Sequence, residues 1–91
     1  MPLPAGWSTT ITQFELVPES ASFGRLVTFL TSNDVTGVAT SAHLSSTQRS
    51  GLSAVDEQTL AWSQVENYVY AYIDEVSGTS AEQVGKLFTP P

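Results

Sequence analysis

His43 is the only histidine in the sequence, which makes it the first residue to consider as a catalytic centre. An imidazole can act as a general base toward a hydroxyl group, and Ser41 lies two residues away. A hydrolase triad also needs a positioned acid and an oxyanion hole, and the chain has no G-x-S-x-G turn. Because serine is common in this part of the chain, a solvated histidine is the simpler interpretation. We therefore predict that the protein is not an enzyme.

Two pairs of adjacent acids, Asp56–Glu57 and Asp74–Glu75, are the other candidates for acid–base chemistry. Neighbouring residues on a helix point about 100° apart, so neither pair can share a proton as a catalytic dyad. Metal binding has no better support, because the chain has no cysteine and "SNDVTG" is only a fragment of a calcium loop. A glycine-rich phosphate cradle is also missing. The sequence predicts no metal site and no cofactor.

Acidic residues dominate the charge of the chain, with nine acids against three basic residues and a net charge of −6. Up to Ser53 there are two basic and three acidic residues, and from Ala54 onward one basic and six acidic residues. A nucleic-acid-binding face needs clustered Lys and Arg, so direct binding of nucleic acid is not expected. Anionic membranes would repel this surface. The remaining interpretations are a protein partner with a basic surface, or simple solubility.

The length of 91 residues fits one domain, with a β-rich half at 1–44, a polar linker at 45–53 and a helical half at 54–91. A domain of this size is marginally stable, so a homo-oligomer or a partner could cover its apolar surface. The first ten residues lack the basic and apolar regions of a signal peptide, and no apolar run approaches the thickness of a bilayer. We expect a soluble, cytoplasmic protein.

The first half of the chain is typical of β structure. Segments 7–17 and 35–44 are rich in β-branched and aromatic residues, and the first stops at Pro18. Residues 20–31 fit either a strand or a helix that Ser20 could cap, since their apolar residues match both periods. The turn-like "TSNDVTG" that follows favours a strand. The prediction is a small antiparallel β-meander of two to three strands over about residues 7–44.

The segment 54–76 contains neither Gly nor Pro, and its apolar spacing predicts a helix of about six turns. Ser53 is a good N-cap, and Gly78 suits the position after the helix end. The helix separates Tyr70 from the other two tyrosines of "YVYAY", which a strand would place on one face with it. The apolar stripe expected to face the sheet consists of Val55, Trp62, Val65, Val69, Tyr72, Ile73 and Val76.

A short second helix is predicted over about residues 80–88, with Thr79 as its N-cap and Glu82 completing a capping box. It should end before Pro90. The apolar residues through which it should pack are Val84, Leu87 and Phe88. Together these elements predict an α+β fold, in which the meander packs on the long amphipathic helix and the short helix follows.

The polar face of the long helix holds the candidate partner-binding residues. Leu60 and Tyr70 lie on this face among the carboxylates of Asp56, Glu66 and Asp74. Apolar anchors within a polar rim are typical of a protein-binding patch. The alternative is that the strands or the short helix cover Leu60 and Tyr70, which would make them part of the core.

In composition the chain resembles the small, acidic, cysteine-free accessory proteins of phages and mobile elements, including anti-CRISPR proteins. That resemblance implies an inhibitor of a basic, nucleic-acid-handling complex in the host cytoplasm. The acids on the long helix lie roughly 12 to 15 Å apart along its axis, which is too sparse to imitate a nucleic-acid backbone closely. We therefore expect a non-enzymatic protein-binding module. The alternative is a structural subunit of a larger assembly, such as a component of a phage virion.

Overall fold

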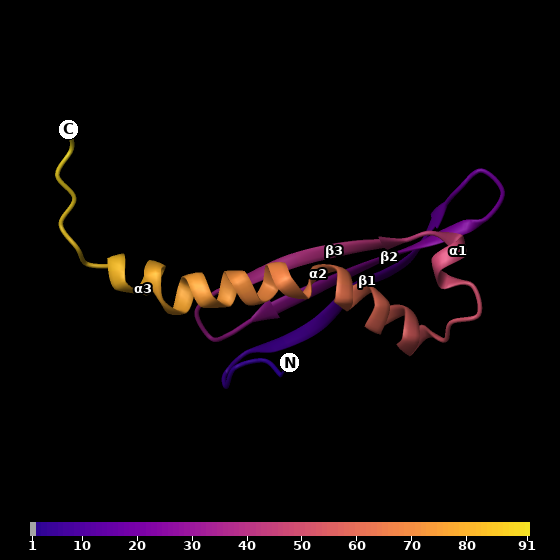
Figure 1. The fold of residues 1–91 in the computed structure, drawn as a ribbon, viewed down its shortest axis with the longest axis horizontal. Helices are drawn as coiled ribbons and strands as arrows, with labels where there is room; N and C mark the ends of the chain where they lie inside the picture. Colours follow the sequence, from indigo (N-terminus) through magenta and orange to yellow (C-terminus); the bar gives the residue numbers. More distant parts are fainter. Residues whose placement is uncertain (1) are drawn as a thin grey trace.

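The computed structural model describes residues 2–91, apart from the side chains of residues 79 and 80. Three strands, β1 (Ser8–Pro18), β2 (Phe23–Ser32) and β3 (Gly37–Leu44), form an antiparallel sheet in the order β1-β2-β3. Three helices follow: α1 (Ser46–Arg49), α2 (Ala54–Ser77) and α3 (Thr79–Gln83). Figure 1 shows α2 lying along one face of the sheet. The fold is α+β, and the predicted meander and long helix are confirmed.

Residues 23–32 form the central strand, so the helical alternative for this segment is wrong. Phe29 pairs with Ile11 on one side and with Thr40 on the other. Val27 and Phe29 are buried on the face toward α2, whereas Leu30 lies on the opposite face and is partly exposed. A strand pairs its backbone on both sides and still buries alternate side chains, which outweighs the helical spacing of the same residues.

The two hairpins that connect the strands have different irregularities. The register between β1 and β2 shifts between Ile11 and Gln13, so Thr12 is an extra residue in the edge strand, as in a β-bulge. In the β2–β3 turn, the side-chain oxygen of Asn33 accepts hydrogen bonds from the backbone N–H groups of Val35 and Thr36 at 2.8 and 2.7 Å. This Asx-type turn explains why the chain reverses at "SNDV".

The core lies between α2 and the inner face of β2 and β3. Ala61, Val65, Val69 and Ile73 are buried at four-residue intervals along α2. Trp62 was expected to be buried with them, but it is only partly buried and packs at the edge of the core. The buried residues of the sheet are Val27, Phe29, Thr31, Thr40, Ala42 and Leu44.

The outer face of the sheet is lined by a row of polar residues across the three strands. The hydroxyl of Thr28 donates to the side-chain oxygen of Gln13 at 2.7 Å and lies 2.8 Å from the hydroxyl of Ser41. Antiparallel sheets often keep one face in contact with water, and this hydrogen-bonded row fits such a face.

Two predicted segments differ from the structure. The stretch 45–53 was predicted as a polar linker, but it contains α1, which begins with a capping box between Ser45 and Gln48. Ser45 Oγ accepts from the backbone N–H of Gln48, and the Gln48 side chain accepts from the backbone N–H of Ser45. The reciprocal cap makes one helical turn stable where the polar composition suggested a loop.

The final helix was predicted over residues 80–88, but α3 ends at Gln83. Leu87 and Phe88, which were expected to pack, are 100% and 82% exposed. Gly85 adopts a positive φ of 86°, which interrupts a helix, and the segment has no core within reach. The N-cap of α3 is Gly78, and the predicted capping role of the Thr79 side chain lies outside the described residues.

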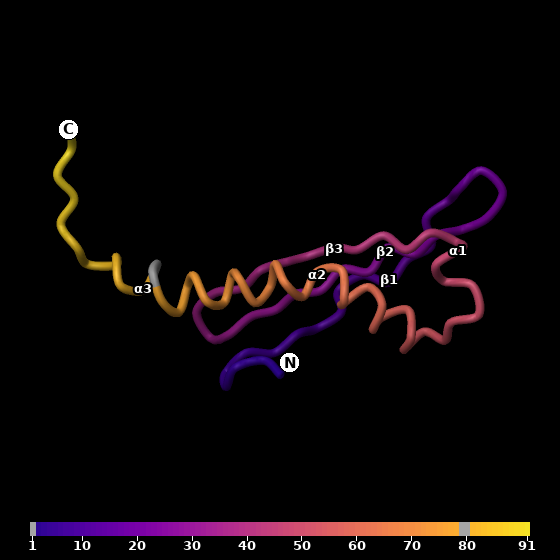
Figure 2. Tube along the Cα trace, viewed as in Figure 1, coloured from indigo at the N-terminus to yellow at the C-terminus, as the bar shows by residue number. Residues whose placement is uncertain are grey.

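The molecule is long and flat, with extents of 57 × 33 × 18 Å. Its radius of gyration is 17.0 Å, whereas a compact domain of this length has a value of about 12 Å. Figure 2 shows the reason, because α3 and the residues after it extend beyond the end of the sheet. Within the described part of the chain, no helix combines the length and the apolar character needed to cross a bilayer.

Candidate functional site

The predicted binding residues all lie on α2, which begins as the sequence predicted. The side chain of Ser53 accepts a hydrogen bond from the backbone N–H of Asp56 at 3.2 Å. Asp56 and Glu57 stand in the first turn, where negative charge favours the helix dipole. Asp56 and Asp74 are exposed, and Glu66 is half-buried. The three carboxylates therefore reach solvent along the helix.

Leu60 and Tyr70 are neither fully buried nor fully exposed. Leu60 packs against the core cluster together with Phe14 and Trp62. The ring of Tyr70 lies edge-on to the ring of Trp62, with 6.5 Å between centroids. Each residue is therefore packed against the domain and also keeps part of its surface accessible. Half-buried aromatic residues of this kind serve as anchors in many interfaces.

Trp62 connects this face of α2 with the sheet. Its ring is edge-on to Phe29 at 5.3 Å and to Tyr70 at 6.5 Å, measured between centroids. A continuous aromatic path thus runs from the buried sheet to the partly exposed Tyr70. At the other end of the sheet, Trp7 lies edge-on to Tyr72 at 6.4 Å, and the hydroxyl of Tyr72 is 2.6 Å from that of Thr36. These contacts hold the second half of α2 in place.

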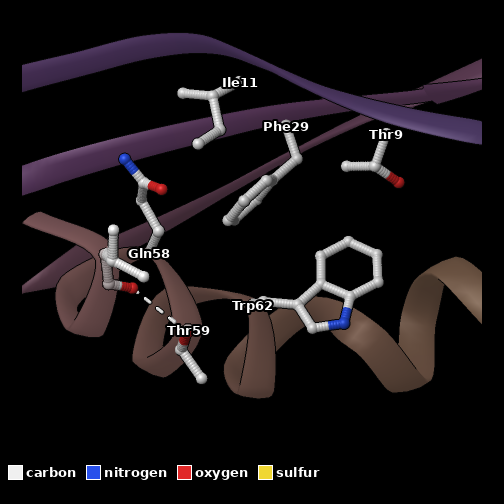
Figure 3. Close-up of a pocket in the computed structure, with 7 residues that line it drawn as sticks. Thr9, Ile11, Phe29, Gln58, Thr59 and Trp62 are labelled. Atoms are coloured by element: carbon white, nitrogen blue, oxygen red, sulfur yellow. Dashed lines mark hydrogen bonds between the residues drawn. The ribbon is translucent and has the colours of Figure 1, made fainter.

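An apolar hollow of about 290 Å³ opens between β1 and the first half of α2. Figure 3 shows Phe29 and Trp62 at its centre, with Ile11 above them on the sheet. The hollow exists because α2 packs mainly on β3 and leaves the inner face of the edge strand β1 partly uncovered. Its lining residues are Thr9, Ile11, Phe29, Val55, Gln58, Thr59 and Trp62. Sequence reasoning placed Val55 on the buried stripe, but the residue is 67% exposed at the rim.

A buried ionic cluster joins β2, α1 and α2. Glu57 is 3% exposed, and its Oε1 accepts a hydrogen bond from Arg49 Nε at 2.6 Å. Arg25 Nε lies 3.5 Å from the other carboxylate oxygen, as a charge contact without a hydrogen bond. The Arg25 guanidinium also lies 4.2 Å from the centre of the Phe14 ring. Sequence analysis considered Glu57 only as one member of the acid pair Asp56–Glu57. In the structure, two of the three basic residues of the chain have Glu57 as their partner.

This cluster decides the charge of the outer surface. Arg25 and Arg49 have side chains only 16% and 22% exposed, because both turn toward Glu57. Of the three basic residues, Lys86 is then the one with an exposed position. The remaining eight acids are all at least partly exposed: Glu15, Glu19, Asp34, Asp56, Glu66, Asp74, Glu75 and Glu82. The fully exposed charged residues are therefore six acids and one lysine.

His43 lies on the outer face of the sheet, beside the acid Glu19. Its Nε2 is 3.9 Å from Glu19 Oε2, and its side chain is 49% exposed. The hydroxyl of Ser22 donates a hydrogen bond to the carboxylate of Glu19 at 3.3 Å, so this hydroxyl contacts the acid of the pair. Gly24 lies beneath this pair, since a side chain there would meet both Glu19 and His43 within 3 Å.

The environment of Glu19 favours its charged form. The side chain of Ser46 contributes most, and its backbone N–H, Ser22 and the nearby His43 add to the effect, so the pKa of Glu19 falls below its ordinary value. Partial desolvation opposes this shift and is the weaker influence. In a nucleophilic site the hydroxyl would face the imidazole. Here the contacts of Glu19 instead join β3 to the loop before β2 and to α1.

Comparison with known proteins returned no matching family model, no matching curated protein and no matching solved structure.

Proposed function

We propose that this protein is a non-enzymatic binding module that recognises a protein partner with a basic surface. In its sharper form, the proposal is an inhibitor of a basic, nucleic-acid-handling host complex, of the kind that phage and mobile-element accessory proteins target. The observation that carries it is the single sign of the accessible charge. Arg25 and Arg49 turn inward to Glu57, so the fully exposed charges are six acids and one lysine, with two further acids half-buried.

A surface with mostly negative charge supports this function through long-range attraction to a positively charged partner. Charges of one sign raise the rate of encounter with an oppositely charged partner, and the effect falls as salt is added. The acids on α2 add direction, because Asp56, Glu66 and Asp74 follow one side of a rigid helix. The apolar sides of Leu60 and Tyr70 lie between these acids and would supply the contact once the partner has docked.

The charge spacing favours a protein partner over close imitation of nucleic acid. Ten and eight residues separate the three α2 acids, which corresponds to roughly 15 and 12 Å of helix. Duplex DNA carries a charge every ~1.7 Å along its axis. The basic groove of a nucleic-acid-handling protein would therefore be occupied through a few ion pairs and an apolar anchor, and not through a continuous row of charges.

The experiment is quantitative capture from native-host lysate by the immobilised protein at low and at high salt. The test variant is Glu66→Lys combined with Asp74→Lys on α2. The matched control is Glu15→Lys combined with Asp34→Lys, which changes net charge equally at exposed positions off this helix. We expect a basic partner that is retained at low salt, released at high salt and lost by the test variant. The proposal would be contradicted if capture did not depend on the salt concentration. It would also be contradicted if the test and control variants lost the partner equally.

A second candidate function is a structural subunit of a larger assembly, such as a virion component. The long, flat shape supports it, with a radius of gyration of 17.0 Å against about 12 Å for a compact domain. The exposed residues Val84, Leu87 and Phe88 support it as well, since neighbouring copies could cover them. Under this function the protein would associate with itself, and a basic partner would not be needed.

A further inference from the structure

We infer that the hollow between β1 and α2 receives Leu87 and Phe88 from a second copy of this chain. The contact rests on the second candidate function, because it specifies how copies of the chain would join in an assembly. It does not depend on a basic partner. It would join unlike surfaces, the hollow of one copy and the final residues of the next. Such a head-to-tail contact builds open chains, or a ring if the rotation between copies closes.

The final residues supply an apolar group that the molecule itself leaves uncovered. Val84, Leu87 and Phe88 are 83%, 100% and 82% exposed, although they lie within five residues of one another. A single exposed apolar residue is ordinary, whereas a group of this kind marks an interaction site. Val84 and Gly85 form a turn after α3, closed by a hydrogen bond from the backbone N–H of Lys86 to the carbonyl of Gln83 at 3.1 Å. The residues after this turn lead away from the sheet (Figure 1).

The chain cannot place these residues in its own hollow. Trp62 is the lining residue of α2 nearest to them in sequence, and α3 ends 21 residues later, at Gln83. At the helical rise this separation is about 31 Å, and Leu87 can return at most ~14 Å from Gln83 even when fully extended. Figure 1 shows the same arrangement, since the final residues leave the far end of α3. Only another copy can bring them to the hollow.

Size and chemistry of the hollow suit the two side chains. Its volume of about 290 Å³ is roughly twice the 150 Å³ of an apolar protein cavity known to bind benzene. One aromatic ring and one branched aliphatic group therefore fit together. The surfaces offered to them are apolar and accessible, because Ile11 is 38% exposed and Val55 is 67% exposed. Phe29 and Trp62 form the floor, where an aromatic ring can pack edge-on (Figure 3).

The charges beside the two surfaces are complementary. Lys86 immediately precedes Leu87 and is exposed, whereas the two arginines are engaged with Glu57. Glu66 lies one helical turn beyond Trp62, on the same face of α2. A lysine that enters with Leu87 would thus meet a carboxylate at this end of the hollow. This match favours a second copy over an apolar segment without a basic residue.

The experiment is sedimentation equilibrium of the full chain from low micromolar to millimolar concentration. Val55→Lys places a charge at the rim of the hollow and leaves the final residues intact. Leu87→Ser combined with Phe88→Ser removes the apolar group and leaves the hollow intact. The matched control is Val35→Lys, the same change at a residue that is 90% exposed in the β2–β3 turn. Circular dichroism confirms that each variant is folded.

We expect the mean mass of the wild type and of Val35→Lys to rise with concentration, and both test variants to remain monomeric. An equimolar mixture of the two test variants should form dimers and nothing larger, because only one hollow and one intact end can pair. Wild type that stays monomeric overturns this contact and removes support for the second candidate function. Association that persists in both variants, or a mixture that stays monomeric, overturns the contact alone.

Discussion

Arg49 Nε donates a 2.6 Å hydrogen bond to the Oε1 of Glu57, an acid whose side chain is only 4% exposed. The same arginine donates through Nη1 to the backbone carbonyl of Phe23 at 3.0 Å. One guanidinium therefore connects α1 with α2 and with the start of β2. A buried carboxylate of this kind contributes little when compared with an apolar replacement, but removing one charge leaves the others buried and unpaired.

Glu57→Gln should therefore lower the free energy of unfolding by about 3 kcal/mol, since two partly buried arginines lose their shared counter-ion. The measurement is urea unfolding followed by fluorescence of the two tryptophans. Glu75→Gln is the control on the same helix, because Glu75 is exposed, and its effect should stay within about 0.5 kcal/mol. Equal effects of the two changes would show that the cluster adds no stability.

The buried side of α2 should be sensitive to truncation. Val69 and Ile73 are 0% and 2% exposed, so replacing either with Ala should cost about 2–4 kcal/mol through lost burial and a residual cavity. Val55→Ala is a matched control, because Val55 is on the same helix and 67% exposed. Thermal or urea unfolding provides the comparison. If Val55→Ala proves as costly as Val69→Ala, the packing of α2 on the sheet is different from the one described.

The lowered pKa of Glu19 has a defined consequence for stability. A carboxyl whose pKa is lowered by folding stabilises the protein above its ordinary pKa, and this contribution disappears as the pH falls through the folded-state value. Glu19→Gln should thus be less stable than the wild type at pH 7, and the difference should vanish on the acid side of the ordinary value of 4.5. Urea midpoints at several pH values test this, with the exposed Glu15→Gln as control. A difference in urea midpoint between wild type and Glu19→Gln that persists down to low pH would contradict this prediction.

Tyr70→Ala should weaken binding of a captured partner by about 2 kcal/mol, mainly through faster dissociation. It should also lower stability by about 1 kcal/mol, because the ring packs edge-on against Trp62. Tyr68→Ala is the control, since Tyr68 is on the same helix and 64% exposed. Surface-immobilised kinetics and thermal unfolding separate the two effects. Unfolding of Tyr70→Ala at room temperature would place Tyr70 in the core instead of in an interface.

His43→Ala should leave partner binding largely intact. The imidazole is half-exposed beside Glu19, and the nearby serine hydroxyl donates to the acid. The variant is to be compared with wild type in the same capture experiment, with circular dichroism as the check of folding. Complete loss of function in a folded His43→Ala protein would reopen a catalytic role.

The strands and the long helix were predictable because their signals are local. The bounds of α2 were predicted to within one residue. The signals were the helical period of the apolar residues, Ser53 as N-cap and Gly78 at the helix end. The central strand was harder, since its apolar residues satisfy both a helical and a strand period. Backbone pairing with both neighbouring strands selects the strand, and that information lies in residues five or more positions away along the chain.

The ionic cluster and the hollow could not be predicted, because each depends on where α2 crosses the sheet. Arg25, Arg49 and Glu57 are separated in sequence and meet only when α1 folds back toward β2. The hollow arises because α2 packs mainly over β3, and no pattern within α2 specifies that position. The final helix was overestimated for a related reason. Its apolar residues fit a helical period, but they have no surface in the monomer to pack against.

The strand order β1-β2-β3 follows the order of the chain, so the sheet has consequences for how folding proceeds. Both hairpins close short loops, which keeps the entropy cost of pairing low and the pairing fast. The sheet can therefore assemble during synthesis, before α2 has left the ribosome. Until α2 arrives, however, Val27, Phe29 and Leu44 face water on the inner side. The interval between these two events is when a nascent chain is most exposed to aggregation and to chaperones.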